Sequence, residues 1–150
     1  MKTVAVDFDG VIHAYSRGWR DGSIYDPPIE GAVDGLRALQ REYSVFIFSS
    51  RSADQIVKWL RALGVDAVTD DEANFPKFWD SRDVVLVTKR KLAACAYLDD
   101  RAVRFTSWPA ALNAVQRAVE ESPAQRVVSL PSGGRVIADV DLPDDEVNRA

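Results

Sequence analysis

Short apolar segments alternate with amphipathic helical segments along most of the chain, and this alternation restricts the fold more than any other feature. The apolar segments that are typical of buried strands cover residues 3–8, 45–48, 65–68, 84–87 and 95–98. Apolar residues at helical spacing predict helices over residues 29–43, 52–64 and 109–121. Ser52 is expected to cap the second helix and Gly64 to end it. Strands alternating with helices predict an α/β fold with a central, mostly parallel sheet.

The last part of the chain has a different pattern. Residues 126–130 and 135–140 flank the sequence Pro-Ser-Gly-Gly, which predicts a β-hairpin. We therefore expect one domain over residues 1–121 and, over residues 122–150, a hairpin extension of the same domain with an acidic tail. The hairpin pairs either with the edge of the sheet or with another subunit, in which case the protein is a homodimer.

Composition excludes several classes of site. The single cysteine and single histidine allow no internal disulfide and no Cys/His zinc site. Of the 23 acidic and 19 basic residues, five acids and one base lie in residues 139–150, which leaves 18 of each elsewhere. With equal numbers of acids and bases, the rest of the chain does not bind nucleic acid through bulk positive charge. No apolar run approaches the ~20 residues that span a bilayer, and the N-terminus lacks a signal-peptide pattern. We expect a cytoplasmic protein with no membrane partner.

Acidic and hydroxyl side chains lie at the ends of three of the predicted strands. Asp7 and Asp9 lie at the end of the first strand, Ser49 follows the second, and Asp99 and Asp100 follow the strand at residues 95–98. The carboxyl ends of parallel strands form the edge at which ligands bind. Carboxylates gathered there repel one another by roughly 4 kcal/mol per pair at ~4 Å. The all-oxygen set of donors therefore predicts a Mg²⁺ site.

These residues lie in segments that resemble the motifs of a known family. Residues 6–11 (Val-Asp-Phe-Asp-Gly-Val) resemble motif I of the haloacid dehalogenase-like (HAD) superfamily, and residues 45–51 resemble motif II. Lys91 and residues 97–101 resemble motifs III and IV. The resemblance extends from about residue 3 to 106 in the family's order. It implies a three-layer Rossmann-like (HAD-like) domain.

The resemblance also implies a reaction and the residues that perform it. Asp7 would be the nucleophile that forms an aspartyl-phosphate, and Asp9 the acid/base. Ser49 and Lys91 would contact the transferring phosphoryl group. Mg²⁺ would be held by the carboxylates of Asp7, Asp99 and Asp100 and by the backbone carbonyl of Asp9. Family members with an acid two residues after the nucleophile are phosphatases or phosphomutases, so we expect a phosphate monoester hydrolase rather than a dehalogenase.

Spacing bears on the substrate. Neither the interval from Asp7 to Ser49 nor that from Ser49 to Lys91 has room for the cap domain of larger family members. An open site suits a large or macromolecular phosphate, or one covered by a neighbouring subunit, and among these we expect a nucleotide or a nucleic-acid end. The side chains expected to bind this substrate are Ser50, Arg51, Arg101, Trp19 and Arg20. His13 is expected to have a structural role. The alternative interpretation is a HAD-like binding or regulatory module with weak catalysis.

Overall fold

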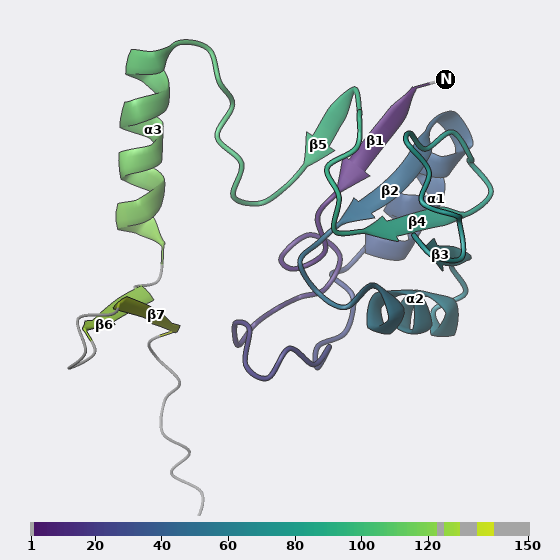
Figure 1. Ribbon diagram of the computed structural model, residues 1–150, viewed down its shortest axis with the longest axis horizontal. Coiled ribbons are helices and arrows are strands. Elements are labelled where there is room, and N and C mark those ends of the chain that lie inside the picture. Colours follow the sequence, from purple (N-terminus) through teal and green to yellow (C-terminus); the bar gives the residue numbers. More distant parts are fainter. Residues whose placement is uncertain (1, 123–124, 130–134, 140–150) are drawn as a thin grey trace, which may run out of the picture. The chain divides into compact units, whose positions relative to one another are not determined.

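The computed structural model describes residues 2–122, 125–129 and 135–139 (Figure 1). It consists of two compact units. The first unit comprises Met1–Ser16 and Arg20–Asp100, and the second comprises Arg17–Trp19 and Arg101–Ala150. All of the strands that were predicted before residue 100 belong to the first unit.

The first unit contains an open sheet of five parallel strands. The strands are β1 (Thr3–Val6), β2 (Ser44–Phe48), β3 (Ala67–Thr69), β4 (Val85–Thr88) and β5 (Ala96–Leu98). Their order in the sheet is β3-β4-β2-β1-β5, and every neighbouring pair is parallel. The predicted parallel α/β fold is therefore confirmed as Rossmann-like.

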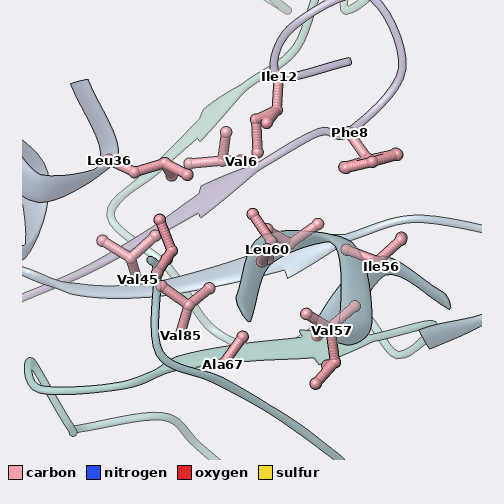
Figure 2. Packing of buried hydrophobic residues seen from close by; sticks show 13 residues of the cluster. Val6, Phe8, Ile12, Leu36, Val45, Ile56, Val57, Leu60, Ala67 and Val85 are labelled. Carbon is pink, nitrogen blue, oxygen red and sulfur yellow. The ribbon is translucent and has the colours of Figure 1, made fainter. Parts of the chain in front are cut away.

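Two helices of the first unit bury their apolar faces against the same side of this sheet. Helix α1 covers Ala32–Glu42 and helix α2 covers Ala53–Ala62. Figure 2 shows helix residues such as Leu36 and Leu60 packed with strand residues such as Val45 and Val85. Ser52 occupies the N-cap position of α2, but its side chain makes no capping hydrogen bond.

The opposite side of the sheet is covered by the connections from β3 to β4 and from β4 to β5 rather than by a helix of this unit. Phe46 and Leu86 alternate with the residues of the first cluster along their strands and form a second cluster with Trp79 and Leu92. Burial on both faces explains why the strands are almost wholly apolar. The polar residues at the strand ends are thereby held on a rigid support.

The second unit contains helix α3 and a pair of strands. Helix α3 (Trp108–Glu121) has Pro109 in its first turn, as predicted, and the Ser107 hydroxyl accepts a capping bond from the Ala110 N–H at 3.4 Å. Strands β6 (Gln125–Ser129) and β7 (Arg135–Asp139) are antiparallel. The predicted hairpin turn and the acidic tail lie outside the described residues. Pairing of the hairpin with another subunit stays a prediction.

Among the described residues, no helix is both long and apolar enough to cross a membrane.

Candidate active site

Three of the predicted acidic residues meet at the carboxyl ends of β1 and β5. Val6 and Leu98 are register partners, and the Asp7 N–H donates to the Leu98 carbonyl at 2.8 Å. This pairing brings Asp7 level with the acids that follow β5. One carboxylate oxygen from each of Asp7, Asp99 and Asp100 lies within 4.8 Å of the others.

Gly10 allows the turn after β1 to approach Asp100 closely. Its φ is +79°, a conformation that residues with a side chain rarely adopt. A Cβ atom at this position would lie only 2.3 Å from Asp100 Oδ2. The glycine of the sequence motif is therefore required both by the backbone and by the neighbouring carboxylate.

The environment of Asp7 disfavours its charged form. Burial raises the pKa of Asp7 from 3.8 to about 6, and repulsion from Asp99, Asp100 and Asp9 adds to this effect. The Phe8 N–H, which donates to Asp7 Oδ1 at 2.7 Å, acts in the opposite direction. The site therefore favours an uncharged carboxyl group at Asp7, chiefly because the group is partly buried.

This raised pKa makes the stability of the metal-free protein dependent on pH. Protonated Asp7 contributes to the free energy of unfolding. This favourable contribution is complete below pH 3.8 and is lost as the pH rises through about 6. Asp7→Asn should therefore stabilise the metal-free protein above pH 6, with little effect near pH 4. If Asp7 were fully buried, a pKa shift of this size would change the free energy of unfolding by about 3 kcal/mol. Because Asp7 is only half-buried, we expect solvent screening to leave about 1 kcal/mol.

Urea unfolding of both proteins in EDTA, at several values between pH 4 and pH 8, measures this difference. Asp66→Asn, which removes an exposed carboxylate, is the matched control. A difference in unfolding free energy between wild type and Asp7→Asn that stayed constant across this range would contradict the expected coupling.

The donor set of the three-acid cluster fits a hard divalent cation. All of its side-chain donors are carboxylate oxygens, which Mg²⁺ prefers. Because Gly10 has no Cβ, Asp100 has room beside the turn after β1. The residues that would hold the ion are Asp7, Asp99 and Asp100. The expected contribution of the Asp9 backbone carbonyl stays a prediction.

Ser49 lies at the end of β2, the strand beside β1. Its side chain is buried, its N–H donates to the Thr88 carbonyl at 3.1 Å, and its Oγ accepts from the Arg51 N–H at 3.2 Å. Ser50, in contrast, is exposed. The Ser49 hydroxyl is thus held at the same edge of the sheet as the acids.

The carboxylate of Asp9 is bound by two buried side chains. Arg51 Nε lies 2.8 Å and 2.7 Å from its two oxygens, and His13 Nδ1 lies 2.8 Å from Oδ1. Arg51 was expected to contact substrate, but only 1% of its surface is exposed. His13 is completely buried, in agreement with a structural role.

The remaining predicted site residues are Lys91, Arg20, Trp19 and Arg101. The side chain of Lys91 is exposed, and its ammonium group lies over the Tyr97 ring, 5.3 Å from the centroid. Arg20 is exposed in the first unit and has a φ of +54°. Trp19 and Arg101 belong to the second unit, so their expected contacts with substrate stay predictions.

One polar cluster near the ends of β3 and β4 was not anticipated. Burial opposes ionisation of Asp70, but hydrogen bonds from Arg90 and from the Thr88 hydroxyl lower its pKa overall. Arg90 also donates to the Pro76 carbonyl at 2.9 Å. The basic run 89–91 thus includes a structural arginine, which no local pattern distinguishes from its two lysines.

Comparison with known proteins gives no family assignment. No family model matches the chain, and no curated protein matches it. A solved structure of a conserved protein from Bacteroides thetaiotaomicron is similar, with 25% identity and a TM-score of 0.46. The similarity covers 77% of this chain and 89% of the other.

Proposed function

We propose that this protein is a Mg²⁺-dependent phosphate monoester hydrolase of the HAD-like type that acts through an aspartyl-phosphate. The observation that carries the proposal is the convergence of Asp7, Asp99 and Asp100 from two strands, with carboxylate oxygens within 4.8 Å of one another. The Ser49 hydroxyl at the end of the neighbouring strand supports it. This combination supplies a carboxylate nucleophile, a cation site and a donor for phosphoryl oxygens.

The proposed reaction has two displacements at phosphorus. In the first, an Asp7 oxygen attacks phosphorus, the bond from phosphorus to the alcohol oxygen breaks, and Asp9 donates a proton to that oxygen. In the second, water attacks phosphorus while Asp9 accepts its proton, and the bond from phosphorus to Asp7 breaks to release phosphate. Ser49 and Lys91 bind the phosphoryl oxygens in both steps. Mg²⁺ would neutralise charge on the Asp7 carboxylate and on the phosphoryl group.

We further propose that the site is open and lacks a cap domain. Every residue between Asp7 and Lys91 is described, and this stretch contains only connections, α1, β2, α2, β3 and β4. An uncovered site admits a phosphate group on a large molecule. Nucleotides and nucleic-acid ends are the proposed substrates.

Phosphate release from a panel of monoesters tests the function directly. The panel contains 3′-phosphorylated oligonucleotides, mononucleotides, sugar phosphates and p-nitrophenyl phosphate, each assayed with Mg²⁺ and with EDTA. We expect release with Mg²⁺ to fall at least about 100-fold in EDTA, because the nucleophile and the phosphoryl group would then repel each other without screening.

The outcome separates the two function classes. Preference for nucleotide or oligonucleotide phosphates supports the proposed substrate class, and preference for sugar phosphates contradicts it. If calorimetry shows Mg²⁺ binding but no ester of the panel is hydrolysed, a binding module, or a hydrolase of a macromolecular substrate outside the panel, replaces the proposed function on these substrates.

A further inference from the structure

Two buried side chains fix the orientation of the Asp9 carboxylate. Arg51 Nε donates to both carboxylate oxygens, and His13 Nδ1 lies within hydrogen-bond distance of one of them. The exposed fractions of Arg51 and His13 are 1% and 0%, while that of the Asp9 side chain is 17%. The two partners are therefore enclosed, whereas the carboxylate retains access to solvent.

The contacts of His13 identify the nitrogen that carries its proton. The Asp26 N–H donates to His13 Nε2 at 3.1 Å, so Nε2 is an acceptor and the proton lies on Nδ1, facing Asp9. The ring stacks on Phe8 with centroids 5.5 Å apart, and Tyr25 and Trp59 pack against it edge-on. This packing prevents the imidazole from turning away from the carboxylate.

Arg51 connects Asp9 to the loop before α1. Its Nη1 donates to the carbonyls of Gly22 and Ser23, the latter at 3.1 Å. Its guanidinium also lies over the Tyr15 ring, 5.5 Å from the centroid. The guanidinium group is planar, and its N–H groups donate both to Asp9 and to the loop carbonyls. These hydrogen bonds fix its position relative to Asp9.

We propose that Arg51 and His13 are positioning residues for the acid–base step, acting through Asp9 rather than on the substrate. The inference rests on the proposed phosphatase function. Proton transfer requires the carboxylate to stand within about 3.2 Å of the alcohol or water oxygen. Since the Asp9 side chain can rotate about two bonds, its two fixed donors restrict it to one orientation. Burial of Arg51 within the chain explains why we assign it to Asp9 instead of to substrate.

The dependence of rate on the leaving group tests this role. An alkyl phosphate needs a proton donor for its leaving oxygen, whereas p-nitrophenyl phosphate has a leaving group stable without one. We expect Arg51→Met and His13→Phe to lower kcat/KM for the alkyl ester by about 100-fold, and for p-nitrophenyl phosphate by less than about 10-fold. This ratio covers only the steps up to departure of the leaving group, whereas kcat also includes the attack of water, which needs Asp9 for both esters. His13→Asn, which retains a donor near Nδ1, should recover part of the loss. Arg37→Met, at an exposed arginine, is the matched control.

Two further measurements distinguish loss of the positioning role from loss of folding. Thermal unfolding shows whether each variant is folded, and Arg51→Lys is used if Arg51→Met is not. In an Asp9→Asn background, a substitution of Arg51 that acts only through Asp9 should cause no further loss on the alkyl ester. Equal losses of kcat/KM on both esters, or full additivity with Asp9→Asn, would overturn the positioning role.

A readout independent of turnover comes from the chain's only histidine. Nitrogen-15 NMR of the metal-free protein should show a proton on Nδ1 and none on Nε2, and Asp9→Asn should shift the Nδ1 signal. A proton on Nε2 would overturn the inference whatever the activity. If wild type hydrolyses no ester, the proposed function fails and the positioning role fails with it. If wild type is active but the leaving-group dependence of the variants is absent, only the positioning role fails.

Discussion

Asp7→Asn should abolish phosphate release, with a loss of more than about 10³-fold in kcat. The amide that replaces the carboxylate is a poor nucleophile, so no aspartyl-phosphate forms. One of the three oxygens in the cation cluster also loses its charge. Steady-state assays with saturating Mg²⁺ on the best ester of the panel measure the effect.

The fold should tolerate this substitution because the raised pKa of Asp7 shows that the site favours the uncharged form. A circular dichroism spectrum identical to that of wild type, together with unimpaired stability in EDTA, would establish that lost turnover is not lost structure. Asp66→Asn, at an exposed carboxylate, should retain full activity. Retention of more than about a tenth of wild-type turnover by Asp7→Asn would refute Asp7 as the nucleophile.

Gly10→Ala should weaken Mg²⁺ binding by at least about tenfold. The new methyl group would lie 2.3 Å from Asp100 Oδ2, so either the β1 turn or Asp100 must move. Movement of either separates Asp100 from Asp7 and breaks the set of three carboxylate oxygens. The left-handed backbone at this position adds a cost of about 1–2 kcal/mol in stability. Calorimetric titration with Mg²⁺ and urea unfolding in EDTA measure the two effects separately.

Gly31→Ala provides a matched control for this prediction. Gly31 has nearly the same φ, +80°, but a Cβ there would meet nothing within 4 Å. We expect Gly31→Ala to destabilise the protein by a similar amount while leaving Mg²⁺ binding unchanged. An equal effect of both substitutions on Mg²⁺ affinity, or none from Gly10→Ala, would show that contact with Asp100 does not shape the site.

Much of the three-acid site can be predicted because it follows from local pattern and one rule of topology. Asp7 and Asp99 each follow an apolar strand, and the carboxyl ends of parallel strands lie at one edge whatever the details of packing. The ends of elements are less predictable. Helix α1 begins at Ala32 rather than at residue 29, and the capping hydroxyl expected at Ser52 makes no cap. Boundaries depend on tertiary contacts that outweigh the small energies of local preference.

The sequence by itself determined the α/β class, the apolar strands and the acids at their ends, because each of these depends on residues that are close together in the chain. Tertiary structure alone decided that β4 lies between β3 and β2, and that Arg51 binds Asp9, from which it is separated by 42 residues. An arginine beside a phosphate-binding motif suits either a substrate or an internal carboxylate. Which partner it takes depends on burial and on the loop carbonyls it meets, and these exist only once the chain has folded.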